Sequence, residues 1–133
     1  LGMKLKEMGV TPTFLLGSRT ENELMQVQEF EKIGPVYITT ENGAVGEQGY
    51  VTQHSVLTRE QFTQVYTCGP KPMMVAVARW AKAAGVPCEV SLENKMACGV
   101  GACLCCVEDT KEGNVCVCKE GPVFAIEKLS WQI

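Results

Sequence analysis

The chain has 133 residues, 46% hydrophobic and 20% charged, which is enough to bury the core of one compact domain or slightly more. A net charge of −3 without any basic cluster excludes the phosphate backbone of a nucleic acid as a natural partner. The longest uncharged run, residues 96–107, is shorter than the roughly 18 residues that a membrane helix needs, and no signal-peptide pattern is present. The sequence therefore predicts a cytoplasmic protein that is not bound to a membrane.

The first predicted element is a helix over residues 1–8, whose apolar side chains share one side. The apolar run at residues 14–17 follows and is typical of a strand buried on both faces of a parallel sheet. Thr20 and Glu23 then have the spacing of a capping box, which predicts a helix that starts there and stops at Gly34.

A second strand is predicted at residues 36–39, followed by a long polar, glycine-rich loop at residues 41–55. We expect the only histidine, His54, to be a solvated side chain of this loop. Thr58 and Gln61 repeat the capping-box spacing and predict a short helix.

A third strand at residues 65–68 leads through a Gly-Pro turn into a helix that ends at Gly85, and a fourth strand is expected at residues 88–92. This alternation predicts right-handed βαβ crossovers, and hence an α/β fold with a parallel sheet. Further on, two β-like stretches and no helix are expected. We therefore predict a nucleotide-binding type of α/β domain at residues 1–88 and a small irregular β module at residues 89–133.

The cysteines are the main chemical signal, because six of the eight lie between Cys98 and Cys118. Cys98, Cys103 and Cys106 have the Cys-x4-Cys-x2-Cys spacing of a plant-type [2Fe-2S] site. The two glycines between the first two cysteines would let the backbone wrap around the cluster and donate N–H groups to it. The fourth thiolate must come from a separate segment.

Other interpretations of the cysteines remain open at this point. Zinc also takes four thiolates, but usually through two short knuckles, of which this chain has only one; unligated thiols are a third possibility. Clustering of the cysteines and a reducing cytoplasm both disfavour disulfides. Spacing does not separate Cys116 from Cys118 as the fourth ligand, because both would lie on one face of a strand. Cys88 and Cys105 are interpreted as small buried hydrophobic residues.

Ligands of open parallel sheets bind beyond the carboxyl ends of the strands. Three predicted strands end in candidate nucleotide-binding residues, although a Gly-Pro turn is also ordinary turn chemistry. These candidates are Gly17, Ser18, Arg19, Thr40, Glu41, Cys68, Gly69 and Pro70.

The segment Met-Ala-Cys98-Gly-Val-Gly-Ala-Cys103-Leu-Cys-Cys106, followed by Cys118-Lys-Glu-Gly-Pro-Val-Phe, resembles the electron-transfer subunit of NAD-dependent dihydroorotate dehydrogenase. The sequence Tyr-Thr-Cys68-Gly-Pro-Lys-Pro-Met-Met is also similar to that family, which is a branch of the ferredoxin reductase superfamily. The resemblance covers nearly the whole chain. It implies a ferredoxin-reductase type of sheet and selects Cys118 as the fourth cluster ligand.

The resemblance also implies a function. Electrons would leave dihydroorotate at a flavin on a separate catalytic subunit, cross the [2Fe-2S] cluster, reach FAD, and leave as hydride on NAD, with the cofactors supplying the chemistry. It implies that residues 17–19 and Glu41 approach the adenosine part of NAD, and that residues 68–70 and Met73 border the nicotinamide.

The chain also departs from the family, because the N-terminal flavin-binding barrel and a first strand with its glycine-rich turn are not in the sequence. We expect a truncated C-terminal fragment that holds NAD weakly, holds no FAD by itself, and associates with itself through exposed strand edges. Two alternatives are a subunit of another flavin-dependent NAD(P)H:ferredoxin or hydrogenase-type reductase, and a zinc-ribbon interaction module.

Overall fold

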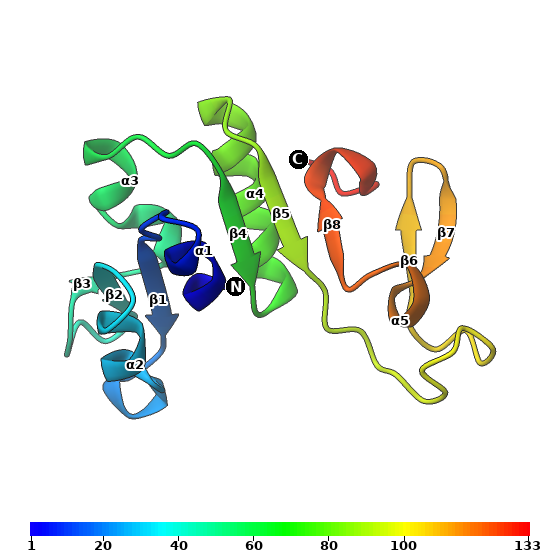
Figure 1. Ribbon diagram of the computed structural model, residues 1–133, viewed down its shortest axis with the longest axis horizontal. Coiled ribbons are helices and arrows are strands. Elements are labelled where there is room, and N and C mark those ends of the chain that lie inside the picture. Colours follow the sequence, from blue (N-terminus) through cyan, green and yellow to red (C-terminus); the bar gives the residue numbers. More distant parts are fainter. The chain divides into compact units, whose positions relative to one another are not determined.

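The computed structural model describes residues 1–133, which divide into two compact units: unit 1 is Leu1–Gln61 and unit 2 is Phe62–Ile133 (Figure 1). The expected boundary near residue 88 separates a cysteine module from the rest and stays a prediction. The longest helix has 14 residues, and no helix combines the length and apolar character that crossing a membrane requires.

Unit 1 is built on a small parallel sheet in the order β1-β2-β3. Its strands are β1 (Phe14–Ser18), β2 (Val36–Thr40) and β3 (Glu47–Gln48). Its helices are α1 (Gly2–Glu7), α2 (Val27–Glu31) and α3 (Val56–Arg59), with 3-10 turns at Glu21–Glu23 and Val51–Gln53. The two longer strands and the first helix are confirmed, whereas β3 lies within the segment expected to be only a loop.

The predicted capping box at Thr20 is wrong. The Thr20 side chain caps nothing, and residues 21–23 form a single 3-10 turn. The Glu23 carboxylate accepts the backbone N–H of Arg19 at 3.0 Å instead of that of Thr20. The helix begins only at Val27, after Gln26 adopts a left-handed φ of 56°. No capping box therefore forms at Thr20, and the helix begins several residues later than predicted.

The predictions at Thr58 and His54 are also wrong. Helix α3 begins before Thr58, whose hydroxyl donates back to the carbonyl of Ser55 at 2.9 Å, as a residue inside a helical turn does. His54 is buried rather than solvated: its Nδ1 accepts the backbone N–H of Val56 at 3.0 Å, and its ring lies edge-on to Tyr37. The imidazole ring therefore accepts a backbone N–H of the first residue of α3 and is part of the buried interior of unit 1.

Unit 2 contains a second sheet in the order β4-β5-β8, in which β4 (Val65–Cys68) is parallel to β5 (Cys88–Ser91). Strand β8 (Val123–Ala125) is antiparallel to β5. The sheet is therefore mixed, whereas a wholly parallel sheet was predicted. Helix α4 (Lys71–Ala84) connects β4 to β5 and ends where Gly85 turns left-handed with a φ of 69°, as predicted. Its buried side chains join those of β5 and β8 in the main core.

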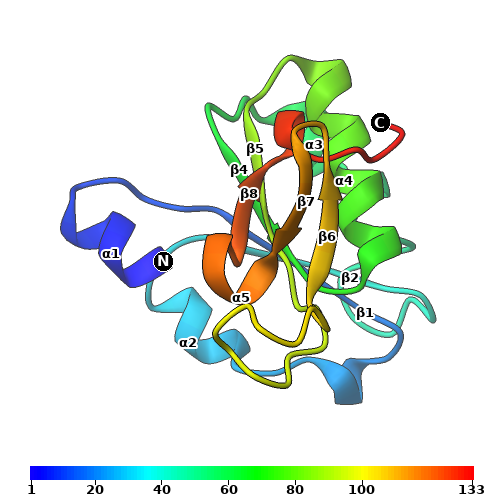
Figure 2. The same cartoon turned by 90° about the vertical axis from the view of Figure 1, so that its right-hand side faces the viewer.

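The rest of unit 2 is a hairpin with a short helix at its end (Figure 2). Strands β6 (Val107–Thr110) and β7 (Gly113–Cys116) pair antiparallel, and helix α5 (Val117–Glu120) follows directly. A 3-10 turn, Ile126–Lys128, follows β8. The expectation of no helix after residue 93 is therefore wrong. The error matters because Cys118 lies in α5 and not on a strand with Cys116.

Candidate functional site

The first predicted cluster ligand, Cys98, lies in the loop between β5 and β6, and its sulfur is surrounded by backbone donors. Sγ of Cys98 accepts N–H groups from Val100 at 3.4 Å, Ala102 at 3.3 Å and Cys103 at 3.4 Å. The backbone N–H groups of Cys103 and Val100, in that order, are the main reason that the pKa of the Cys98 thiol falls to about 6. This loop stabilises a thiolate, which is the form that binds a metal.

The two glycines of the loop make this wrapping possible. Gly99 has a φ of 69° and Gly101 a φ of 81°, the left-handed region that other L-residues occupy only at a cost. Because successive residues turn back on themselves there, their N–H groups point inward at one sulfur, as in an anion-binding nest.

Two further predicted ligands, Cys106 and Cys118, lie against each other. The backbone N–H of Cys118 donates to Sγ of Cys106 at 3.4 Å, and that of Val117 donates to the Cys106 carbonyl at 3.0 Å. The backbone N–H of Cys118 lowers the pKa of the Cys106 thiol, and the hydrogen bond between the two thiols raises the pKa of Cys118 to about 11. Helix α5 is the element that brings Cys118 to the buried Cys106.

The remaining two cysteines of this region are Cys105, whose pKa is raised mainly by a hydrogen bond with the Cys103 thiol, and Cys116. The Cys116 thiol donates to the carbonyl of Gly101 at 3.7 Å, and burial raises its pKa. Cys105 is exposed, so its interpretation as a buried residue is wrong, whereas Cys88 is fully buried as expected. Sequence spacing could not separate Cys116 from Cys118, because the strand ends at Cys116 and only the turn into α5 gives the two thiols different neighbours.

The four predicted ligands thus form two contacting pairs, in which the backbone N–H of Cys103 donates to Sγ of Cys98 and that of Cys118 donates to Sγ of Cys106. No three His, Cys, Asp or Glu side chains gather around one point as a site for a single ion. Two thiolate pairs are nevertheless the donor set of a [2Fe-2S] cluster, in which four cysteines are shared between two irons. The chemistry of the donors and the glycine-bent loop therefore fit this cluster.

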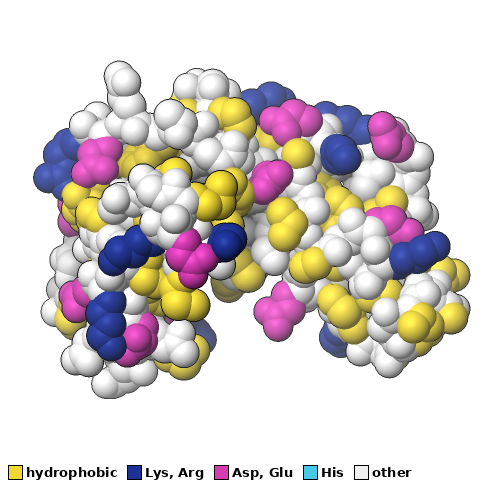
Figure 3. Space-filling model, in the orientation of Figure 1, with side chains coloured by type: hydrophobic (Ala, Val, Ile, Leu, Met, Phe, Trp, Pro, Cys, Tyr) yellow, Lys and Arg dark blue, Asp and Glu magenta, His cyan; other side chains and the backbone are white.

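Hydrophobic side chains gather over the cysteine loop on the face shown in Figure 3. Met96, Val100 and Leu104 are 50%, 71% and 64% exposed. The predicted cluster loop therefore exposes three apolar side chains to solvent.

In unit 1, the structure brings the predicted residues at the ends of β1 and β2 together. The strands pair in register so that Ser18 lies beside Thr40. Beyond the strands, the backbone N–H of Glu41 donates to the Ser18 carbonyl at 3.1 Å, and that of Asn42 donates to the Arg19 carbonyl at 3.2 Å. The carboxyl ends of the two strands therefore form one edge, as an open parallel sheet requires.

Three acidic side chains, Glu21, Glu23 and Glu41, and one arginine lie at or near this edge. The Arg19 guanidinium lies 3.6 Å from the Glu23 carboxylate, and Asn42 donates to Glu21 at 3.1 Å. The hydrogen bond from Asn42 lowers the pKa of the Glu21 carboxyl. The edge therefore offers carboxylates and one partly neutralised arginine to a ligand.

In unit 2, the predicted residues at the end of β4 also lie together. Gly69, with a φ of 144°, makes the turn from Cys68 to Pro70, which is the N-cap of α4. A Cβ added at Gly69 would lie 2.6 Å from Cε of Met73, so Met73 packs directly on this turn. These four residues therefore lie together at one turn, and their role in binding a nucleotide stays a prediction.

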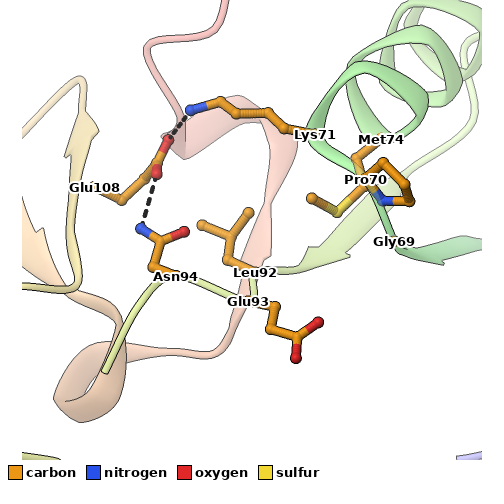
Figure 4. Close-up of a pocket in the computed structure, with 8 residues that line it drawn as sticks. All are labelled: Gly69, Pro70, Lys71, Met74, Leu92, Glu93, Asn94 and Glu108. Atoms are coloured by element: carbon orange, nitrogen blue, oxygen red, sulfur yellow. Dashed lines mark hydrogen bonds and ion pairs between the residues drawn. The ribbon is translucent and has the colours of Figure 1, made fainter. Parts of the chain in front are cut away.

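A pocket of about 370 Å³ opens at this turn (Figure 4). Besides Gly69 and Pro70, it is lined by residues that the sequence did not single out: Lys71, Met74, Leu92, Glu93, Asn94 and Glu108. Figure 4 shows the Glu108 carboxylate held between Lys71 and Asn94. Hydrogen bonds from Trp131, Asn94 and Lys71 outweigh the effect of burial, which alone would raise the pKa of Glu108, and hold that pKa below its usual value.

Comparison with protein families matches residues 93–130 to the iron-sulfur cluster binding domain of dihydroorotate dehydrogenase B. A relative in Methanocaldococcus jannaschii, a probable dihydroorotate dehydrogenase B (NAD(+)) electron transfer subunit, is 41% identical over 131 residues, 96% of this chain and 50% of the relative. The subunit of that name in Caldanaerobacter subterraneus is 42% identical over 113 residues, covering 82% and 46% of the two chains. That of Listeria innocua is 39% identical over 134 residues, covering 98% and 52%.

A solved structure has the same fold. It is that of an NADH-dependent reduced ferredoxin-NADP oxidoreductase, described for flavin-based electron bifurcation, and it matches with a TM-score of 0.84 at 32% identity over 98% of this chain and 48% of that one. The expected ferredoxin-reductase type of α/β fold is thereby confirmed. The chain spans about half the length of the curated relatives it matches, and over that span it is similar to the electron-transfer subunits of dihydroorotate dehydrogenase B.

Proposed function

We propose that this chain is part of an electron-transfer subunit that carries electrons from a dihydroorotate-oxidising flavoprotein, through a [2Fe-2S] cluster and FAD, to NAD in pyrimidine biosynthesis. The observation that carries the proposal is the loop in which three backbone N–H groups converge on Sγ of Cys98, within the segment that matches the cluster-binding domain. The partner would be a flavin-containing catalytic subunit, and the complex would work in the cytoplasm.

The cluster ligands in this proposal are Cys98, Cys103, Cys106 and Cys118. A [2Fe-2S] cluster supplies one-electron transfer when bound, and the protein sets its potential through charge, exposure and hydrogen bonds to sulfur. The chain provides N–H donors to two of the four sulfurs, those of Cys98 and Cys106. These hydrogen bonds favour the thiolate form of both side chains and so prepare them as ligands.

NAD would bind at the edges described above, with its adenosine part at Gly17, Ser18, Arg19, Thr40 and Glu41 and its nicotinamide at Cys68, Gly69, Pro70 and Met73. Support comes from the register that joins β1 to β2 and from the pocket at the Gly69–Pro70 turn. FAD enters the proposal through the family alone, and no residue of this chain is assigned to it.

A second candidate is a subunit of a ferredoxin-linked, flavin-dependent NAD(P)H reductase. The match to the NADH-dependent reduced ferredoxin-NADP oxidoreductase favours it, because it covers nearly the whole chain. The two candidates differ in the electron donor. Anaerobic stopped-flow spectroscopy of the cluster-loaded protein, with either a dihydroorotate-reduced catalytic flavoprotein or a reduced ferredoxin, distinguishes them: rapid bleaching by the ferredoxin alone would favour the second.

Metal analysis tests the cluster itself. Protein purified without oxygen should be red-brown and contain about two irons and about two acid-labile sulfides per chain. A colourless chain with one tightly held zinc would overturn the proposal and support the zinc-ribbon alternative.

Serine substitutions test the ligand set. Cys118→Ser should lose or destabilise the cluster, because this thiol lies against Cys106. Cys116→Ser is the matched control and should keep the cluster, because its thiol hydrogen-bonds to a carbonyl instead. The reverse pattern would assign the fourth ligand to Cys116.

A further inference from the structure

Glu108 is a buried carboxylate with three hydrogen-bond donors from three separate segments. Lys71 Nζ and Trp131 Nε1 donate to Oε1 at 3.0 and 2.9 Å, and Asn94 Nδ2 donates to Oε2 at 3.1 Å. The Glu108 side chain is 8% exposed, whereas that of Lys71 is 59% exposed. Lys71 therefore reaches in from the surface to a charge that has little contact with water.

A buried charge persists only where partners replace the lost hydration. Glu108 meets this requirement in full, because both oxygens accept hydrogen bonds and one donor is a cation. The Lys71 ammonium also lies 5.5 Å from the centre of the Trp131 ring, in the range of a cation–π contact. Removing either charge therefore leaves the other without its counterpart.

Two of the segments joined at Glu108, its own and that of Asn94, lead directly to predicted cluster ligands. Cys106 directly precedes β6, two residues before Glu108, and both residues are buried. Asn94 stands at the start of the cysteine loop, and its amide also donates to the carbonyl of Val107 at 3.4 Å. Lys71 is the first residue of α4, directly after the Gly69–Pro70 turn.

We infer that Glu108 is a positioning residue of the cluster module, and that its ion pair with Lys71 sets the reduction potential of the cluster. The carboxylate fixes β6, which directly follows Cys106, and the start of the loop that contains Cys98, against the first turn of α4. Groups that hold metal ligands in this way orient the ligands and tune the metal. The inference rests on the proposed function, because it requires a cluster at these cysteines.

The two charges should act on the potential with opposite signs. A negative charge beside a cluster opposes the arrival of an electron, and a positive charge favours it. Glu108→Gln, which keeps the size and one acceptor, should therefore raise the midpoint potential. Lys71→Met, which keeps most of the length without the charge, should lower it. A purely structural role would change the two variants in the same direction, because both lose the same contact.

The experiment is a redox titration of the cluster-loaded chain, followed by its visible and EPR spectra, with iron and sulfide counted in every sample. Lys111→Met is the matched control: it removes the same charge from an exposed lysine at the far end of β6 that has no ion-pair partner, and it should shift the potential least. Urea unfolding of the same proteins should show lower midpoints for Glu108→Gln and Lys71→Met than for Lys111→Met.

Shifts of opposite sign in the two variants, both larger than that of the control, support the inference. Shifts of the same sign, or no shift beyond the control, overturn it while the proposed function stands. If Glu108→Gln holds no cluster, the test rests on the Lys71→Met variant, since Lys71 is exposed. An unchanged or raised midpoint potential in Lys71→Met then overturns the inference. A wild-type chain without iron overturns the proposed function and this inference with it.

Discussion

Replacing Gly99 by alanine tests whether the left-handed backbone of the cysteine loop serves the cluster. Gly99 has a φ of 69°, and a Cβ added there would meet no atom within 4 Å. The cost of the substitution therefore comes from the backbone conformation alone and amounts to about 1–2 kcal/mol. If the loop needs this conformation to aim its N–H groups at Cys98, the cluster should be held about 5- to 30-fold less tightly.

Gly85→Ala is the matched control. Gly85 also has a φ of 69° and no atom within 4 Å of an added Cβ, but it ends α4 instead of bending the cysteine loop. The same penalty of about 1–2 kcal/mol should therefore appear in the free energy of unfolding, with cluster affinity unchanged.

Two measurements separate these effects. Competition for iron with a chelator at a series of concentrations reports cluster affinity, and urea unfolding of the cluster-free chain reports stability. We expect Gly99→Ala to change mainly the first and Gly85→Ala mainly the second. If Gly99→Ala retained iron like the wild type and lost only stability, the left-handed turn would be a feature of the fold and not of ligand presentation.

Three further predictions concern the thiols, the nucleotide and the strand edges. Burial raises the pKa of Cys88 to about 11, so about 0.1% of this thiol is ionised at pH 8. Mass spectrometry after iodoacetamide treatment should therefore find the exposed Cys68 modified before Cys88. Early modification of Cys88 would show that unit 2 opens readily. The chain has no G-x-G-x-x-G turn to hold a pyrophosphate, so calorimetry should find weak NAD binding, and a dissociation constant in the low micromolar range would contradict this. Strands β1 and β4 are both edge strands, so light scattering at micromolar concentration should find self-association. A strictly monomeric mass would contradict this prediction.

The strands were predictable because their signal is local and strong. Each of the runs that became β1, β2, β4 and β5 is apolar and is bounded by glycine, proline or polar residues, and the structure reproduces them to within about two residues. The helix starts at Thr20 and Thr58 were not predictable, because a capping box depends on which backbone N–H a carboxylate or amide reaches. Glu23 reaches Arg19 instead, and no sequence pattern separates these two outcomes.

The candidate ligands show the same division. The spacing of Cys98, Cys103 and Cys106 is a local pattern with a chemical reason, and it was sufficient to predict a cluster loop. The choice between Cys116 and Cys118 depends on a turn of four residues, α5, that has too few residues to show helical periodicity. In the structure, that turn directs one cysteine to Gly101 and the other to Cys106.

Glu108 lay beyond any local pattern, because its partners are 37, 14 and 23 residues away along the chain. In the sequence it is one of fifteen acidic residues, two positions after a cysteine. Folding makes it different: three distant segments converge on one carboxylate, and each supplies a donor that a buried charge requires. Cys106 directly precedes β6 and lies two residues before Glu108. This connects the convergence to the cluster, since a chain anchored at one residue has little freedom two residues away. Under the proposed function, a cluster that must stay in a fixed place gives this chain a reason to keep a charge in its interior.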